Sequence, residues 1–284
     1  MKIEKYSVKG SSPWNEDGLI VMDEEQVYGV VDGATSLVPF SGANGETGGY
    51  YAASIVMETA KRILTEQRQG NAPLHDILIK TNRALHEAMV RHGMDMSKKE
   101  ELWSAGVLLI RIGETGIEYA QAGDCMLTAI YEDGIIRVIT RDQLSHVDRE
   151  TYRLWAEGAA AGMTARDQLW NYVKPQIVGG RQSANTSAGY GVLNGQPEAA
   201  DFLEYGRINR INLKALLLMT DGLYVPKRAG ETLFDAAEAA ALIDRMGLES
   251  YAEWLIEMEE SDPDCLVYPR VKKSDDKTAI WIEL

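Results

Sequence analysis

The chain has 284 residues, 45% of them hydrophobic, and its 29 lysines and arginines are outnumbered by 43 aspartates and glutamates, for a formal charge of −14. This length and hydrophobic content allow a substantial core. The negative charge disfavours the phosphate backbone of nucleic acids and the anionic face of a membrane, so we expect neither as a partner.

The cysteines and the N-terminal residues bear on the compartment. Cys125 and Cys265 lie far apart in the chain, and their spacing indicates neither a zinc knuckle nor a disulfide framework. Residues 1–10 are polar and lack the apolar segment of a signal peptide. The chain also has no run of roughly 18 apolar residues that could form a membrane-spanning helix. These features predict a soluble, cytoplasmic protein.

The first third of the chain predicts a hairpin followed by two helices. Short apolar runs at 18–22 and 26–31 are separated by acidic residues and predict two buried strands. A glycine-rich stretch at 41–49 follows. Apolar residues then recur at helical spacing until Gln69-Gly70, and again in a second predicted helix over about 73–93.

Strands dominate the middle of the chain. Apolar runs at 105–112, 117–122, 126–131 and 135–140 are separated by glycines and aspartates and predict a meander of antiparallel strands. The segment at about 144–201 mixes a short helical piece with glycine, serine and asparagine. We expect it to be an irregular, flap-like insertion over one end of the sheet.

The last third predicts a strand at 215–219, two helices within 231–260 and a terminal strand at 277–284. Strands and helix pairs in this order predict helices that cover both outer faces of paired antiparallel sheets. Since the sequence contains no repeat or linker, we expect residues 1–284 to form a single domain.

Acidic residues repeatedly lie where an apolar strand starts or stops. A carboxylate at such a point is fixed by a rigid scaffold and yet faces solvent, as the coordination of a hard cation requires. Any one Asp-Gly pair is better explained as a turn. The repetition at strand ends, however, predicts a shared metal site, and its candidate residues are Glu16, Asp17, Asp32, Asp124, Asp221 and Asp275.

Six segments together resemble the type 2C family of metal-dependent Ser/Thr protein phosphatases. They are NEDGLIV (15–21), VYGVVDGA (27–34), WSAGVLLI (103–110), AGDCML (122–127), LLLMTDGLY (216–224) and SDDKTAIWI (274–282). The resemblance implies an α+β fold, a four-layer α-β-β-α sandwich of two antiparallel sheets flanked by helix pairs. It also implies two divalent metal ions, Mn²⁺ or Mg²⁺, between the sheets at one edge.

The resemblance assigns roles to the first group of acidic residues. Asp32 matches the carboxylate that bridges the two ions, and Gly33 would offer its backbone carbonyl to one of them. Glu16 and Asp17 match the acidic pair on that same ion. We expect Asp17 to be the more important of the two, with Glu16 bound directly or through water.

The remaining acidic positions complete the expected centre. Asp221 and Asp275 match the ligands of the other ion, and Asp124 matches a position that helps to hold a third, weaker metal. A water shared by two ions about 3.5–4 Å apart becomes a hydroxide that attacks phosphorus in line with the leaving oxygen. The carboxylates of Asp17, Asp32, Asp221 and Asp275 are then the expected catalytic set, and no cysteine or serine nucleophile is needed.

Departures from the family pattern affect phosphate binding and proton transfer. Ser12 lies where many members have the arginine that binds the substrate phosphate, and Ala34 lies where some have a histidine suggested as general acid. A metal-bound water or His146 would then protonate the leaving group. Asp276 replaces the usual asparagine. Arginines elsewhere in the chain are candidates for phosphate binding, and the sequence does not choose among Arg62, Arg111, Arg137, Arg141 and Arg181.

The main hypothesis is a cytoplasmic phosphatase that hydrolyses phosphoserine or phosphothreonine in proteins. Two alternatives stay open at this point. One is a catalytically impaired relative that binds phosphoproteins as a regulator, motivated by the absent arginine and histidine. The other is a phosphatase of a small phosphorylated metabolite. The sequence does not specify an oligomeric state.

Overall fold

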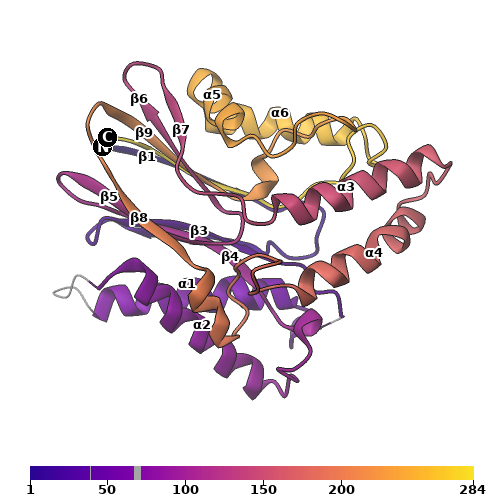
Figure 1. Cartoon of the computed structure of the whole chain (residues 1–284). Coiled ribbons are helices and arrows are strands. Elements are labelled where there is room, and N and C mark those ends of the chain that lie inside the picture. The colour runs from indigo at the N-terminus through magenta and orange to yellow at the C-terminus, as the bar shows by residue number, and fades with distance from the viewer. Residues whose placement is uncertain (39, 67–71) are drawn as a thin grey trace.

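A computed structural model describes residues 1–38, 40–66 and 72–284. It shows two five-stranded antiparallel sheets packed face to face, with helices on both outer faces (Figure 1). The strand order is β1-β10-β9-β6-β7 in the first sheet and β2-β3-β4-β5-β8 in the second. The α+β sandwich predicted from the sequence is confirmed.

The strands are β1 (Lys2–Val8), β2 (Asp17–Met22), β3 (Val27–Gly33), β4 (Ala105–Ile112), β5 (Gly116–Ala122), β6 (Met126–Tyr131), β7 (Ile136–Val138), β8 (Glu204–Asn209), β9 (Leu213–Met219) and β10 (Lys277–Glu283). The α-helices are α1 (Gly48–Glu66), α2 (Leu74–Arg91), α3 (Ser145–Ala160), α4 (Arg166–Gln182), α5 (Ala236–Met246) and α6 (Leu248–Glu260). Short 3₁₀ helices are η1 (Lys99–Glu101), η2 (Pro197–Phe202) and η3 (Asp221–Leu223).

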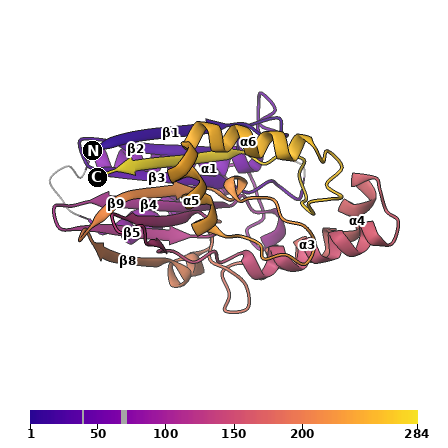
Figure 2. The ribbon, with the colours of Figure 1, turned by 90° about the horizontal axis from the view of Figure 1, so that it is seen from above.

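The central strands are buried on both faces, which explains their continuous apolar sequences. In β9, Leu216 and Leu218 point into the space between the sheets, whereas Leu217 and Met219 pack under α5 and α6. The helices α1 and α2 cover the outer face of the second sheet in the same way. Figure 2 shows α5 and α6 lying over the first sheet.

The first hairpin and the helices on both outer faces agree with the sequence prediction. The strands β2 and β3 pair antiparallel, with Asp17 opposite Asp32. The helix α1 is described as far as Glu66, so its predicted end at Gln69-Gly70 lies outside the described residues.

The prediction of one meander over 105–140 is wrong. The strands β4 and β5 pair in the second sheet, but β6 and β7 pair in the first, so the chain changes sheets between Ala122 and Met126. Gly123 makes this turn with a φ of +87°, a conformation that costs glycine little. Local alternation cannot distinguish a tight hairpin from such a crossing, because both need only a short turn.

The segment at 144–201 is more regular than expected, because most of it forms α3 and α4. These two helices, hereafter the α3–α4 arm (residues 145–182), pack on each other around Trp155, Leu169 and Val173. The spacing of Leu169, Val173 and Ile177 is helical. Pro175 lies inside α4, although proline usually kinks or ends a helix.

Two edge strands were missed by the sequence analysis. Among the described residues, β1 pairs with β10 alone and β8 with β5 alone, so each lies at the edge of its sheet. Edge strands carry charged and polar residues, which hides the apolar alternation. Within the described parts of the chain, no helix combines the length and apolar character needed to cross a membrane.

Candidate metal centre

Strand register brings the predicted acidic residues to one end of the sandwich. Asp32 lies opposite Asp17 on one side and opposite Gly106 on the other. Across the sandwich, the ends of β6, β9 and β10 meet, because Met219 pairs with both Met126 and Ala279. The turn that contains Asp124, the start of η3 at Asp221 and the loop that ends at Asp275 therefore lie at this same end.

A cavity of about 210 Å³ opens where these loops converge. Four of the predicted carboxylates line it, together with the backbone of Gly33. They come from separate elements of both sheets and are those of Asp32, Asp124, Asp221 and Asp275. Gly106 lets Asp124 approach β4, because a Cβ atom at Gly106 would lie 2.8 Å from Asp124 Oδ1.

Asp17 lies beside this cavity and does not line it. The residue is 9% exposed, and its Oδ2 accepts a hydrogen bond of 2.8 Å from Thr220 Oγ1. This bond joins β2 in one sheet to the end of β9 in the other. Asp17 is thus placed between the sheets, directly behind Asp32.

Glu16 lies further from the cavity. It is buried, and its carboxylate accepts hydrogen bonds from the hydroxyl groups of Thr35 and Thr47. In the structure its side chain therefore supports the loop that follows β3, in place of pointing into the cavity.

Asp276 has a positioning role that differs from that of its neighbour. Its two carboxylate oxygens accept hydrogen bonds from the backbone N–H groups of Gly10 and Glu16, each at 2.7 Å. Asp276 thereby ties the beginning of β10 to the acidic pair before β2.

The buried carboxylates raise one another's pKa values. Burial raises the pKa of Asp32 well above its usual range, and Asp17, Asp221 and Asp124 raise it further. Burial and the neighbouring Asp275 raise the pKa of Asp221 to about 6. The pKa values of Asp17 and Asp124 are raised for the same reasons. Bringing these groups together as anions is therefore costly unless positive charge is placed among them.

Lys272 supplies one positive charge at the edge of this cluster. Its Nζ lies 2.6 Å from Asp275 Oδ1, and the side chain lines the same cavity. Burial lowers the pKa of Lys272, but the carboxylates of Asp275, Glu16 and Asp32 outweigh this and raise it overall. A single ammonium group does not balance four or more carboxylates.

The donor set fits divalent metal ions in its chemistry. Hard cations such as Mg²⁺ and Mn²⁺ take carboxylate and carbonyl oxygens, and the cavity provides both at Asp32, Gly33 and Asp221. As the side chains stand, no three acidic, histidine or cysteine side chains in residues 1–38, 40–66 and 72–284 form a closed ligand group. Asp17 and Asp275 are instead turned toward Thr220 and Lys272, with which they form hydrogen bonds.

The structure separates Arg181 from the other arginine candidates for phosphate binding. Arg181, near the C-terminal end of α4, lines the cavity and donates hydrogen bonds to Ser104 Oγ (2.6 Å) and to the backbone oxygen of Thr35 (3.2 Å). Arg62 forms an exposed ion pair with Glu66.

The remaining candidates lie away from the cavity. Arg111 is paired with Glu118 at 2.7 Å, and Arg137 is exposed on β7. Arg141 borders a different recess, under α5. His146 is exposed and does not line the cavity, so its position does not favour it as the general acid.

Sequence reasoning missed several cavity residues, among them Asp148, Tyr152 and Lys272. The first two come from α3 in the segment whose conformation the sequence did not reveal. Burial, Asp142 and Asp221 raise the pKa of Asp148, while Arg181 lowers it. Lys272 lies three residues before Asp275, and this spacing was the only signal for it in the sequence.

Comparisons with known proteins agree with this fold. The profile of the family described as protein phosphatase 2C matches residues 13–258. No curated protein sequence matches the chain at a significant level.

Solved structures share the fold at low sequence identity. The serine/threonine phosphatase Stp1 from Staphylococcus aureus is 16% identical, with a TM-score of 0.59 over 100% of this chain and 94% of that one. PstP/Ppp from Mycobacterium tuberculosis is 17% identical, with a TM-score of 0.57 over 100% and 98%. A PstP catalytic domain in complex with two manganese ions is 16% identical, with a TM-score of 0.56 over 99% and 97%. Since the family profile spans most of the chain, the chain belongs to the protein phosphatase 2C family of metal-dependent serine/threonine phosphatases.

Proposed function

We propose that this protein removes phosphate from phosphoserine and phosphothreonine in protein substrates, with Mn²⁺ or Mg²⁺ held by the carboxylate cluster. The observation that carries the proposal is the cavity in which Asp32, Asp124, Asp221 and Asp275 converge from both sheets. Membership of the 2C family supports the same reaction.

The carboxylates divide between two metal positions. Asp32 lies centrally and would serve both ions, and the carbonyl of Gly33 and the carboxylate of Asp17 would serve the first. Glu16 would act on that ion through water, because its own carboxylate is held by two threonines. Such ions supply Lewis acidity and an activated water at neutral pH.

The second position would be served by Asp221 and Asp275, which line the cavity together. Asp124 would take part in a third, weaker site, with Asp148 as its nearest acidic neighbour on the arm. Lys272 would have to release Asp275 when an ion binds, since its ammonium group now occupies one oxygen of that carboxylate.

Arg181 is the residue we assign to the substrate phosphate. Its guanidinium group is anchored by Ser104 and Thr35, and it borders the same cavity as Lys272. A planar guanidinium group suits a phosphate dianion through paired hydrogen bonds. It would compensate for Ser12, which lies where many relatives have an arginine.

We further propose a cytoplasmic signalling role for one phosphatase unit spanning residues 1–284. Both cysteines are buried and unpaired, which is compatible with a reducing compartment. The α3–α4 arm and the core of the sandwich contribute to one cavity, which supports treating them as a single functional unit.

The test is hydrolysis of a phosphoserine peptide and of p-nitrophenyl phosphate by metal-stripped protein with Mn²⁺, Mg²⁺ or EDTA. We expect turnover only with added metal and a loss of about 100-fold or more for Asp32→Asn. Asp201→Asn, at an exposed position in η2, is the matched control and should retain activity. Metal-independent turnover, or full activity of Asp32→Asn, would contradict the proposal.

A further inference from the structure

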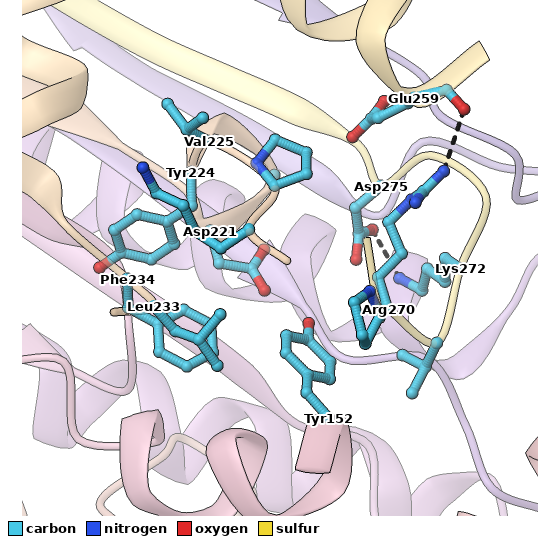
Figure 3. A pocket seen from close by; sticks show the side chains of 15 residues that line it. Tyr152, Asp221, Tyr224, Val225, Leu233, Phe234, Glu259, Arg270, Lys272 and Asp275 are labelled. Atoms are coloured by element: carbon cyan, nitrogen blue, oxygen red, sulfur yellow. Dashed lines mark hydrogen bonds and ion pairs between the residues drawn. The ribbon is translucent and has the colours of Figure 1, made fainter. Parts of the chain in front are cut away.

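A second recess opens beside the cavity that holds the carboxylates, and we call it the side recess. The two share Tyr152, Asp221, Lys272 and Asp275, so they meet at the proposed reaction centre. Figure 3 shows the side recess, with the hydroxyl group of Tyr152 pointing inward between Asp221 and Lys272.

The wall away from these charges is apolar. Val225, Pro226, Leu233 and Phe234, from the segment between η3 and α5, line it, and Val271 adds apolar surface where the two hollows meet. Leu233 and Phe234 lie across the recess from Lys272 and Arg270 (Figure 3). The recess therefore offers apolar surface directly next to a strongly charged centre.

Aromatic packing fixes this wall. The ring of Phe234 meets that of Tyr224 edge to face, with the centroids 5.5 Å apart, and lies 5.7 Å from that of Tyr152. The side recess is thus formed by packed rings that link α3 to the segment before α5, and it needs no ligand to shape it.

The cationic and most of the anionic side chains that border the recess already have partners. Lys227 pairs with Glu238 at 2.6 Å, and Lys272 pairs with Asp275. The two other paired side chains, Arg270 and Glu259, form ion pairs with residues outside the lining of the recess. Arg270 bonds Asp262 at 2.9 Å, and Glu259 bonds the buried Lys277 at 2.8 Å. Apart from Asp221, which the proposed function assigns to a metal ion, these side chains offer an entering charged group no free partner to replace its lost hydration, whereas an apolar group would lose nothing.

We propose that the side recess binds an apolar side chain, aliphatic or aromatic, that flanks the phosphorylated residue of a protein substrate. The inference rests on the proposed function, because that function puts the phosphate in the neighbouring cavity. Successive Cα atoms of a peptide are about 3.8 Å apart, so a residue one or two positions away reaches a recess that shares a border with the phosphate site. The continuity of the two hollows at Asp221 and Asp275 identifies the occupant as part of the substrate itself.

The test is a panel of phosphoserine peptides with leucine, phenylalanine, aspartate or lysine at each of the two positions on either side, and alanine elsewhere. We expect kcat/KM at one of these positions to be about 10-fold higher for leucine or phenylalanine than for aspartate or lysine. In Leu233→Asn, which keeps the net charge, that ratio should fall to about 2-fold or less. Ile211→Asn, at a position 72% exposed on the β8–β9 turn, should keep the full ratio.

Hydrolysis of p-nitrophenyl phosphate distinguishes a failure of the side-recess proposal from a failure of the proposed phosphatase function. If that compound is hydrolysed but the panel is flat, or if Leu233→Asn keeps the wild-type ratio, the side recess is not a substrate site and the phosphatase function stands. If nothing is hydrolysed, the proposed function fails. Fluorescence anisotropy with the same peptides then tests binding in the side recess. Tighter binding of the leucine peptides than of the aspartate or lysine peptides supports the proposal, and equal binding overturns it.

Discussion

Two adjacent aspartates show how partners decide a residue's role. Asp275 borders both hollows and pairs with Lys272, whereas Asp276 accepts the N–H groups of Gly10 and Glu16. The sequence marks both as acidic residues before a strand. Only the direction of each side chain separates a group that lines the cavity from one that orders the backbone.

Arg181→Met should raise KM for a phosphopeptide and lower kcat/KM by about 10-fold or more, because a charge-assisted hydrogen bond contributes about 1.5–3 kcal/mol. Binding of Mn²⁺, measured by calorimetry without substrate, should be unaffected. Arg62→Met is the control, since Arg62 is exposed and pairs with Glu66. Unchanged steady-state kinetics in Arg181→Met would remove this residue from the phosphate site.

The convergence of the strand-end carboxylates on one cavity was predictable from the sequence, whereas the contribution of the α3–α4 arm was not. Asp32, Asp124, Asp221 and Asp275 follow or precede apolar strands, and strand ends are visible in the local sequence. Tyr152 and Arg181 reach the cavity only because α3 and α4 fold back over the end of the sandwich. That packing depends on distant contacts, such as the hydrogen bond of Trp155 to the backbone of Cys265, which no local pattern encodes.

At the scale of elements, the loop between α6 and β10 places Asp275. Arg270 holds this loop by donating to the backbone oxygens of Glu259, Asp262, Tyr268 and Lys273. Lys277, at the start of β10, is fully buried and pairs with Glu259. Its Nζ also donates to the backbone oxygen of Asp275 at 3.1 Å.

Glu259→Gln should lower the free energy of unfolding by about 3–5 kcal/mol, because it leaves the ammonium group of Lys277 buried without a counter-charge. Denaturant unfolding measures the change. Glu260→Gln is the matched control in the adjacent position, where the side chain is 63% exposed and pairs with Lys273, and it should cost less than about 1 kcal/mol. Equal effects of the two variants would show that the buried pair does not anchor the loop.

The elements that the sequence predicted well are those with a strong apolar period, such as β4, β9 and α2. The strands β1 and β8 were not predicted because they lie at sheet edges, where polar and charged residues interrupt the apolar alternation. The passage of the chain from one sheet to the other at Gly123 was not predicted, because such a crossing and a hairpin have similar turn sequences. The sequence therefore predicted the layers better than the connections between them.

At the scale of the whole molecule, the cluster of buried carboxylates lowers the stability of the metal-free protein. The pKa of Asp221 is raised to about 6 by burial and by Asp275, so this group binds its proton more tightly in the folded state than in the unfolded one. Between about pH 4 and pH 6, the unfolded chain ionises first, and stability falls as the pH rises. Above the folded pKa the full penalty is present unless cations are bound.

Metal-free protein should therefore melt at a lower temperature near pH 7 than near pH 5, and Mn²⁺ should raise the melting temperature near pH 7. Asp221→Asn should stabilise the metal-free protein by on the order of 3 kcal/mol near pH 7, and by about half of that near pH 5. The same variant should gain less from Mn²⁺. Calorimetric scans in EDTA and in Mn²⁺ measure both effects. If the wild-type protein near pH 7 melted at a higher temperature in EDTA than in Mn²⁺, the assignment of Asp221 to a metal site would be contradicted.

The pairing of β1 with β10 has a practical consequence. Lys2 lies opposite Glu283, so the two ends of the described chain leave the sandwich side by side, at the end away from the α3–α4 arm (Figure 1). If the protein were attached to a surface, a fluorophore or a fused partner at either end, the cavity lined by the carboxylates would face away from the point of attachment. Large phosphorylated proteins could then still reach the centre while the phosphatase is immobilised.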